Sequence, residues 1–136
     1  MPRSDSDPKH ARHLALGAEG EARAAEHLKA RGYRIADRNV RAGGVEIDLV
    51  AERAGVVVFV EVKTRRSRRH GGGEAAVHWS KRRRLVDGAH AWLAARRRPI
   101  RRVRFDVIAW QVEPAEGNRE PTWLMTHYEG AFDASD

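Results

Sequence analysis

The sequence predicts an α/β domain whose mixed sheet is built in the order α-β-β-β-α-β, followed by one more strand. Two segments, residues 14–31 and 80–95, repeat apolar residues at the spacing of an amphipathic helix. The other segments are rich in β-branched residues or alternate polar with apolar ones. We expect residues 14–132 to form a single domain, and residues 1–13, which are polar and contain two prolines, to form a disordered tail.

The first predicted helix runs from Leu14 to about Arg31, and Gly32 is a typical helix stop. Its apolar stripe consists of Leu14, Ala18, Ala22, Ala25 and Leu28. Glu21 lies within this stripe, so its carboxylate either reaches the edge of the helix or has a partner inside the protein. Periodicity alone does not separate these two alternatives.

An irregular strand over residues 33–41 and a turn at Gly43-Gly44 lead into a β-hairpin over residues 45–63. Ala54-Gly55 supplies a two-residue turn, so the numbers of directly opposed residues sum to 109. Side chains alternate along a strand, which gives the hairpin one polar and one apolar face. The apolar face holds Ile47, Leu49, Ala51, Val56, Val58, Val60 and Val62.

On the polar face, this register makes Asp48 face Glu61 and Glu46 face Lys63. Two carboxylates directly opposed at about 5 Å repel each other unless a cation lies between them. Oxygen ligands at this spacing suit Mg²⁺ or Mn²⁺, which polarise a phosphate and activate a water molecule. The alternative is a hairpin with a solvated polar face, and a longer turn would shift the pairs.

The second predicted helix begins at Ser80, a candidate N-cap, and ends near Ala95. Its apolar stripe is Leu85, Val86, Ala89, Trp92 and Leu93. A strand over residues 103–112 follows, and a short strand over residues 123–128 comes last. Because the third strand, the second helix and the fourth strand form a βαβ crossover, we expect that connection to be right-handed.

The basic charge of the chain is concentrated in one block. Residues 63–104 hold fifteen Lys or Arg against two acidic residues, whereas residues 105–136 hold seven acidic residues against one arginine. Nucleic acid is the commonest polyanion that such a block binds. An arginine-rich surface without a partner would not account for the acidic last third. The candidate contacts are Arg65, Arg66, Arg68 and Arg69 in a predicted loop, and Lys81, Arg82, Arg83 and Arg84 in the first turn of the second helix.

The composition excludes several classes of protein. With no cysteine, the chain has no thiol nucleophile, disulfide or cysteine-ligated zinc. No apolar run approaches the length of a membrane span, and the polar start lacks a signal-peptide core. The seven histidines form no HxxxH pair, and no GxSxG motif is present. We therefore expect a soluble cytoplasmic protein without a membrane partner.

Five short blocks carry a resemblance to a known family. They are Gly20-Glu21, residues 46–51 (Glu-Ile-Asp-Leu-Val-Ala), residues 59–65 (Phe-Val-Glu-Val-Lys-Thr-Arg), Lys81 with Arg84-Leu85, and residues 104–107 (Arg-Phe-Asp-Val). In this order and spacing, over roughly residues 14–132, the chain resembles the bacterial YraN-like family of predicted endonucleases. That family is related to archaeal Holliday-junction resolvases within the restriction-endonuclease-like, PD-(D/E)XK superfamily. A lone D-(x)-ExK motif is weak, but the five blocks together are specific.

The resemblance implies a restriction-endonuclease-like core with a site for Mg²⁺ or Mn²⁺. The implied catalytic groups are the metal ligands Asp48, Glu61, Glu21 and the Val62 carbonyl, together with Lys63, which would position or activate the attacking water. Glu46 and Asp106 would support this site. The superfamily's proline is replaced by Ile47 and the family's usual glycine by Val45, but neither change removes a ligand.

The sequence thus favours an endonuclease that hydrolyses phosphodiester bonds, in branched or flapped DNA, with a bound divalent metal. The alternative is a basic nucleic-acid-binding module, for RNA among others, whose site is inert. Glu21, Asp48, Glu61 and Lys63 together favour the enzyme, because binding alone requires none of them. The preferred nucleic-acid structure, the number of metal ions and the assembly, with a homodimer as one option, stay open.

Overall fold

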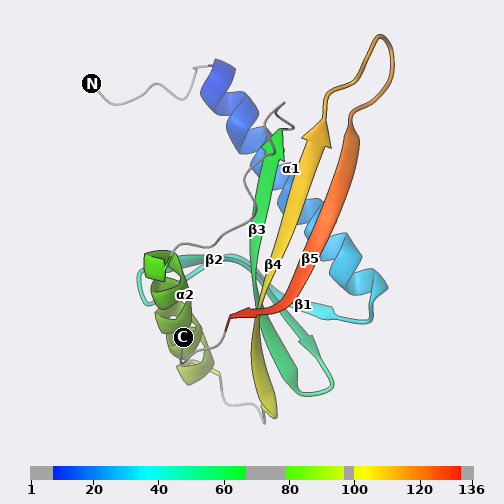
Figure 1. Ribbon diagram of the computed structural model, residues 1–136. Coiled ribbons are helices and arrows are strands. Elements are labelled where there is room, and N and C mark those ends of the chain that lie inside the picture. Colours follow the sequence, from blue (N-terminus) through cyan, green and yellow to red (C-terminus); the bar gives the residue numbers. More distant parts are fainter. Residues whose placement is uncertain (1–7, 67–78, 97–99, 133–136) are drawn as a thin grey trace, which may run out of the picture.

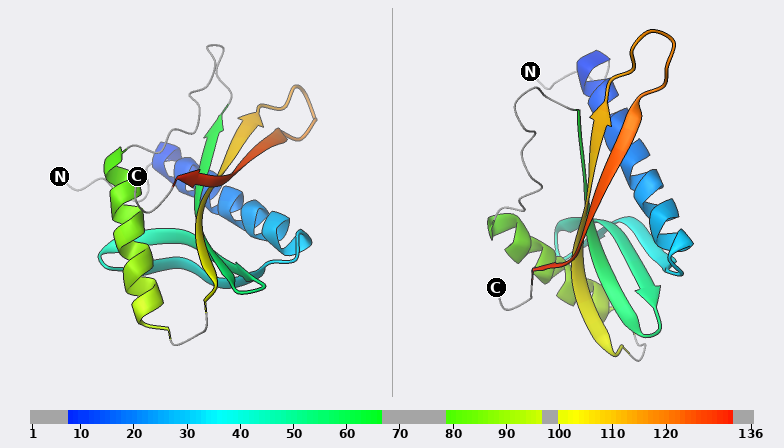
Figure 2. Two further views of the ribbon diagram at one scale, coloured as in Figure 1. Left: turned by 60° about the horizontal axis from the view of Figure 1, so that its bottom comes forward. Right: turned by 45° about the vertical axis from the view of Figure 1, so that its right-hand side comes forward.

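Two helices and five strands make up the described part of the chain, which in this computed structural model is residues 8–66, 79–96 and 100–132. The elements are α1 (Pro8–Ala30), β1 (Arg34–Ala42), β2 (Val45–Arg53), β3 (Val56–Arg66), α2 (Trp79–Ala94), β4 (Arg102–Glu113) and β5 (Thr122–Phe132). Helix α1 lies against one face of the twisted sheet and α2 against the other, which gives three layers (Figures 1 and 2). The predicted α/β class and order of elements are confirmed.

The strands lie in the order β1-β2-β3-β4-β5. Neighbouring strands are antiparallel except β3 and β4, which are parallel. A parallel neighbour requires a crossover connection, and the segment containing α2 supplies it, as the sequence predicts. Strand β3 is the central strand, with the antiparallel strand β2 on one side and the parallel strand β4 on the other.

Two hydrophobic cores hold the layers together. On one face, Ala24, Ala25 and Leu28 of α1 pack against side chains of the sheet that include Val60 and Ile108. On the other face, the predicted stripe of α2 packs against a second set, in which Phe59 contacts Trp92 edge to face at 5.6 Å. Burying each large apolar side chain contributes about 1.5–3 kcal/mol, so these two cores supply most of the stabilisation.

The predictions for α1 are only partly correct. The helix begins at Pro8, not Leu14, because no helix breaker lies between them and proline is well suited to the first helical position. Residues 8–13 are therefore helical rather than a disordered tail, while residues 1–7 lie outside the described part. Leu14 is 60% exposed, and Ala18 and Ala22 are also exposed. A stripe made largely of alanine has too little contrast in hydrophobicity to mark the buried face.

Gly20 determines which face of α1 contacts the sheet. A Cβ atom at this position would lie 1.9 Å from Oγ1 of Thr64 on β3. The Nε1–H group of Trp110 donates a hydrogen bond to the Gly20 carbonyl oxygen at 2.9 Å. Only glycine permits this approach of helix to strand, which brings the neighbouring Glu21 to the sheet.

The hairpin turn has the predicted form. Ala54 and Gly55 both have positive φ angles, 51° and 80°, as a two-residue hairpin turn with the right twist requires. The five recorded pairs, from Arg53 opposite Val56 to Leu49 opposite Val60, follow the predicted register. The predicted turn and the register next to it are therefore confirmed.

Candidate functional site: an acidic cleft between strands β2 and β3

A cleft of about 330 Å³ lies at the end of the β2–β3 ladder, beside the first turns of α2. Three carboxylates line it, those of Glu46 and Asp48 on β2 and Glu61 on β3. The cations of Arg41 and Arg84 line the same cleft. The structure thus brings together acidic groups from both arms of the hairpin, together with one of the predicted phosphate-binding arginines.

The way in which these carboxylates meet differs from the prediction. The recorded β2–β3 ladder ends at Leu49 opposite Val60, so Asp48 and Glu61 are not a ladder pair, and neither are Glu46 and Lys63. Beyond that point, Oδ2 of Asp48 accepts a hydrogen bond from the backbone N–H of Val62 at 2.8 Å. The side chain of Asp48 therefore takes the place of a backbone partner in the ladder.

The faces of β2 also change at Asp48. Leu49 belongs to the core under α1, whereas Ile47 belongs to the core under α2, so the predicted common face for these two residues is wrong. On β1, Asn39 lies between the partners of Ile47 and Leu49 and has a φ angle of 46°. Asparagine tolerates this left-handed conformation, which allows the paired strands to rotate out of phase.

Glu21 of α1 contacts Asp48, one of the residues that line the cleft. Its side chain shares hydrogen bonds with Asn39 and with Asp48. Burial raises the pKa of the Glu21 carboxyl most, and the charges of Glu46 and Glu61 raise it further, against the lowering effect of the two hydrogen bonds. Of the two alternatives for Glu21, the structure favours a partner inside the protein. A hydrogen bond between two carboxyl groups requires a proton on one of them.

Strand β3 presents its functional groups on two sides. Glu61 is 4% exposed, and Lys63 lies on the same side of the strand because side chains alternate. The N–H and C=O groups of one strand residue point to the same neighbouring strand. Since the N–H group of Val62 donates to Asp48, its carbonyl oxygen also faces the gap between β2 and β3.

The predicted basic contacts are described in part. Arg65 and Arg66 are exposed and belong to the end of β3 rather than to a loop, because the strand continues to Arg66. Arg83 is exposed, and the guanidinium of Arg82 lies 5.4 Å from the ring of Phe132. Arg68, Arg69 and the side chain of Lys81 lie outside the described part.

Asp106 does not line the cleft. It is fully buried on the face that packs against α1, where Arg104 donates two hydrogen bonds to it, both at 2.9 Å. The Nε2 atom of His127 and the backbone N–H of Gly130 complete its shell at 2.8 and 3.0 Å. The sequence predicts that Asp106 supports the site. Its contacts instead join Arg104, His127 and Gly130 within the fold.

The donor set of the cleft fits a hard divalent cation, although it is not arranged around one. In residues 8–66, 79–96 and 100–132, no three acidic or histidine side chains stand in positions that would hold a metal ion. Carboxylate oxygens are nevertheless the ligands that Mg²⁺ and Mn²⁺ prefer. Metal ligands bind as carboxylates, so a cation would compete with protons for Glu21, whose pKa is raised, and side chains would have to rotate toward the ion.

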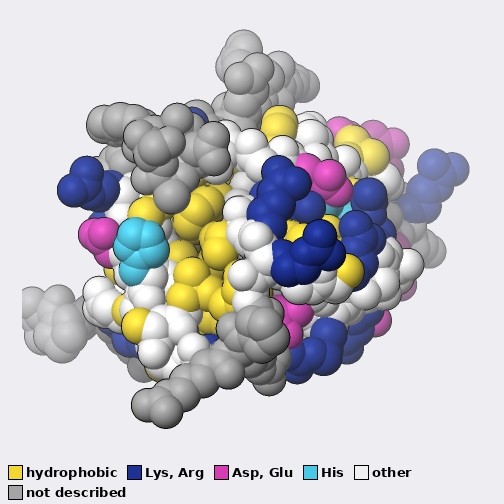
Figure 3. All heavy atoms as spheres, turned by 90° about the horizontal axis from the view of Figure 1, so that it is seen from below, with side chains coloured by type: hydrophobic (Ala, Val, Ile, Leu, Met, Phe, Trp, Pro, Cys, Tyr) yellow, Lys and Arg dark blue, Asp and Glu magenta, His cyan; other side chains and the backbone are white. Residues whose placement is uncertain are grey.

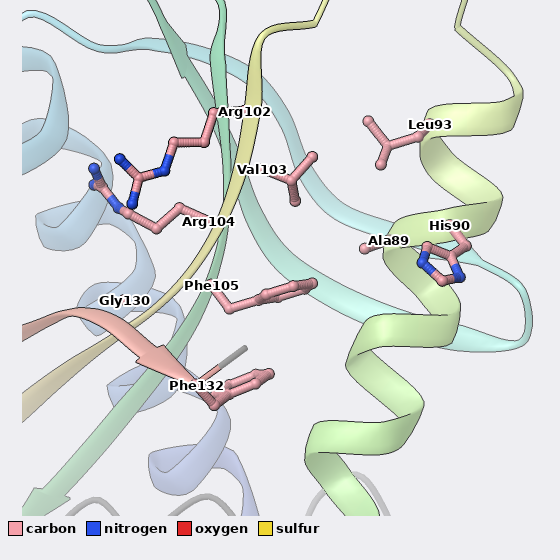
Figure 4. A pocket seen from close by; sticks show the side chains of 9 residues that line it. All are labelled: Ala89, His90, Leu93, Arg102, Val103, Arg104, Phe105, Gly130 and Phe132. Atoms are coloured by element: carbon pink, nitrogen blue, oxygen red, sulfur yellow. The ribbon is translucent and has the colours of Figure 1, made fainter. Parts of the chain in front are cut away.

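A second hollow, seen from below in Figure 3, is chemically different from the acidic cleft. It has a volume of about 290 Å³ and lies between α2, β4 and the end of β5. In Figure 4, Leu93, Val103, Phe105 and Phe132 lie around it, while the guanidinium groups of Arg102 and Arg104 extend to the opposite side of β4. Among the described residues that line it there is no carboxylate, so we place the candidate site in the acidic cleft.

Sequence reasoning missed three residues of the cleft region: Gly20, Asn39 and Arg41. Gly20 belongs to one of the motif blocks, but its packing role has a separate signal, since a glycine within a helix often marks close packing. Asn39 carries a weak signal, since asparagine is among the few residues that adopt a positive φ angle. Arg41 carries no signal that distinguishes it from the other arginines of a basic chain.

These observations define the class as a mixed α/β protein with an acidic cleft beside basic side chains. Residues 20–110 match the model of the uncharacterised protein family UPF0102, and the chain belongs to this family. It is 43% identical over 120 residues to a UPF0102 protein of Trichlorobacter lovleyi, covering 88% of this chain and 91% of the relative. It is 50% identical over 104 residues to one of Symbiobacterium thermophilum, covering 76% and 86%. No helix in the described part of the chain is long and apolar enough to cross a membrane.

Proposed function

We propose that this protein is a Mg²⁺- or Mn²⁺-dependent endonuclease that hydrolyses phosphodiester bonds in branched or flapped DNA. The proposal includes a restriction-endonuclease-like core of the YraN-like, PD-(D/E)XK type. The observation that carries it is the hydrogen-bonded pair of Glu21 and Asp48, from two different elements, beside Glu46 and Glu61. Carboxylates gathered in this way disfavour each other's ionisation, and a divalent cation removes that penalty.

The proposed ligands are Asp48, Glu61, Glu21 and the carbonyl oxygen of Val62. A bound ion would polarise a phosphate oxygen and lower the pKa of a water molecule. The N–H group of Val62 fixes the orientation of Asp48, and Glu46 adds negative charge at the rim. A bound ion would be held between α1, β2 and β3, which limits its movement.

The cations of the site would act on the substrate. Lys63, on the same side of β3 as Glu61, would orient the attacking water through its ammonium group. Arg84 lines the cleft and would neutralise the phosphate to be cut. The remaining basic residues would hold the neighbouring phosphates of the strand. They are Arg65, Arg66, Arg68, Arg69, Lys81, Arg82 and Arg83.

Labelled flap, fork, four-way and linear DNA, each incubated with Mg²⁺ or Mn²⁺, tests the proposal. We expect metal-dependent cleavage of the branched or flapped forms, and slower single-turnover cleavage by Glu21→Gln at saturating metal with DNA affinity retained in EDTA. Glu26→Gln, an exposed glutamate on the same helix, is the matched control and should cleave like the wild type. Absence of cleavage of every substrate would exclude the nuclease, and full activity of Glu21→Gln would remove Glu21 from the site.

A basic nucleic-acid-binding module without catalysis, for DNA or RNA, is the second candidate. The observation that favours it is that the described carboxylates are not arranged around a cation. Such a module would bind the same probes with a steep dependence on salt and would leave them intact with either metal. Cleavage by the wild type that is lost in Asp48→Asn would exclude this candidate.

A further inference from the structure

A third cavity, of about 520 Å³, lies on the α1 side of the sheet, away from the acidic cleft. Leu16, Glu19 and Arg23 of α1 line it together with Arg66, Trp123 and residues of the β4–β5 connection. Figure 1 shows that connection and the beginning of α1 at the same end of the molecule. Its volume falls within the range of sites for small organic ligands.

The floor of this cavity is apolar and contains a fixed aromatic ring. Leu16, Val112, Pro114 and Pro121 supply aliphatic surface around the half-buried Trp123. The ring of Trp123 meets that of Trp110 edge to face, with centroids 5.7 Å apart and an interplanar angle of 76°. Packing against Trp110 orients this ring, so stacking a planar ligand on it costs little further ordering.

An arginine plane covers one face of the ring. The guanidinium carbon of Arg23 lies over the Trp123 ring, 4.3 Å from its centre, and Nε of Arg23 donates to Glu19 at 2.8 Å. Glu19 therefore holds Arg23 on the aromatic face. Indole and guanidinium planes are the two surfaces on which proteins stack unpaired bases.

The rim of the cavity carries charges of both signs. Arg23 and Glu19 are paired with each other, which leaves Arg66 to hold a phosphate and Glu120 to accept hydrogen bonds from the amino groups of a base. A planar polar ring attached to an anion satisfies both of these groups. A lipid chain or an apolar side chain would not.

The cavity is lined by α1, whereas the acidic cleft is lined by α2. Arg66 stands three residues after Lys63 on β3, about 10 Å along the strand at 3.3 Å per residue, and side-chain alternation points the two to opposite faces of the sheet. A nucleic-acid strand that occupies both sites must therefore pass the end of β3.

We propose that this cavity binds an unpaired nucleobase of the substrate, stacked on the pair formed by Trp123 and Arg23, with its phosphate on Arg66. The inference rests on the proposed function for the identity of the polymer, and it defines the substrate class as nucleic acid with a single-stranded segment at a duplex end. The acidic cleft would provide the chemistry, and this cavity would provide the preference for unpaired nucleotides.

Binding measured in EDTA by fluorescence anisotropy tests this proposal without cleavage. The probes are a blunt DNA hairpin and the same hairpin with a three-nucleotide overhang. The wild type should prefer the overhang by at least about 5-fold, the effect of stacking one base. Trp123→Leu should abolish that preference without changing affinity for the blunt probe, and Trp123→Phe, which keeps an aromatic ring, should retain most of it. Thermal melts would establish that both variants fold.

Two further measurements do not depend on replacing Trp123. A 2-aminopurine base in the overhang should lose fluorescence on binding to the wild type, and the same base within the duplex should not. Arg66→Gln should reduce affinity for the overhang probe and lower its salt slope by about 0.7, the value for one phosphate of a single strand. Arg38→Gln, an exposed arginine on β1, is the matched control and should leave both quantities unchanged.

The outcomes separate this inference from the nuclease proposal. An overhang preference that depends on Trp123, without metal-dependent cleavage, would support the cavity and contradict the nuclease. Cleavage by a wild type that binds both probes equally would contradict the cavity proposal alone. An overhang preference that survives in Trp123→Leu would do the same. No binding to either probe would overturn both.

Discussion

Asp106 on β4 and Glu21 on α1 are both carboxyl groups withdrawn from water, yet their surroundings shift their pKa values in opposite directions. Burial alone would raise the pKa of Asp106, but hydrogen bonds from His127, Arg104 and the Gly130 N–H outweigh it and lower the pKa. For Glu21, burial and two neighbouring carboxylates together raise the pKa. One carboxyl group is surrounded by donors and the other by acids.

The difference indicates separate roles. The donors around Asp106 join three parts of the fold, because Arg104 also donates to Tyr33 at 2.8 Å and His127 contacts His27 of α1 at 3.0 Å. A buried ion network that is fully hydrogen-bonded fixes a structure. The acids around Glu21 do not stabilise the fold in this way, which supports the ligand role proposed for them.

The largest expected effect concerns chemistry in the cleft alone. Lys63→Ala should reduce single-turnover cleavage by at least about 100-fold, because the proposed mechanism uses this cation mainly in the transition state. The rise in Tm caused by Mn²⁺ should persist, since the proposed ligands remain. Lys29→Ala, an exposed lysine of α1, is the control. Full activity of Lys63→Ala would contradict the proposed mechanism.

Disrupting the Asp106 network should lower the stability of the fold and leave the response to Mn²⁺ unchanged. Arg104→Met leaves Asp106 with fewer donors and should cost about 3 kcal/mol of the free energy of unfolding, the lower end for a broken buried pair. Chemical denaturation measures this loss, and the Mn²⁺-induced shift should remain. The exposed Arg102 lies two residues away on the same side of β4 (Figure 4), so Arg102→Met is the control. A loss below about 1 kcal/mol would mean that the network does not stabilise the fold.

Helix α1 joins the two regions, and its fit at Gly20 can be tested by compensation. Gly20→Ala should cost about 2 kcal/mol, because its Cβ would overlap the Thr64 hydroxyl. That hydroxyl is buried and has no hydrogen-bond partner within the described residues, so removing it is cheap. The double variant Gly20→Ala, Thr64→Ala should recover most of the loss in denaturation experiments. Strictly additive effects would indicate that the two positions do not touch.

Asp48→Asn tests whether Asp48 is a metal ligand in the acidic cleft. The amide can still accept from the Val62 N–H and donate to Glu21, and one negative charge is removed. Without metal, the free energy of unfolding should therefore stay within about 1 kcal/mol of the wild type or rise slightly. The Mn²⁺-induced rise in Tm should disappear. An equal Mn²⁺ shift in both proteins would exclude Asp48 as a ligand.

The smallest effect concerns pH at the contact between α1 and the Asp106 network. Burial, then the charges of His127 and Arg31, lower the pKa of His27, and Glu129 partly opposes them. The unfolded chain therefore binds a proton more readily, so this contribution to stability is present above the ordinary histidine pKa of about 6.5 and is lost as pH falls through the folded pKa. Between pH 7 and 5, His27→Gln should lose less stability than the wild type. His90→Gln, on α2, should follow the wild type.

The parts of this structure that depend on nearby residues could be predicted from sequence. Both helices, the glycine-containing turns and the first pairs of the hairpin follow from short patterns, because turn geometry and strand alternation act over a few residues. The nearness of Asp48 to Glu61 follows from the same hairpin. The end of the β2–β3 ladder does not, because it depends on the carboxylate of Asp48 competing with the backbone for the Val62 amide.

Short patterns in the sequence predict the α/β class, the order of elements, the concentration of basic charge and the nearness of acidic residues within one hairpin. Packing between distant segments, which those patterns do not encode, brings Glu21 to Asp48, places Asp106 in a separate network and makes Trp123 line a cavity shared with α1. The reason is the range of the interactions. His27 and His127 are 100 residues apart in the chain, and the periodicity of either segment carries no information about a partner brought to it by packing.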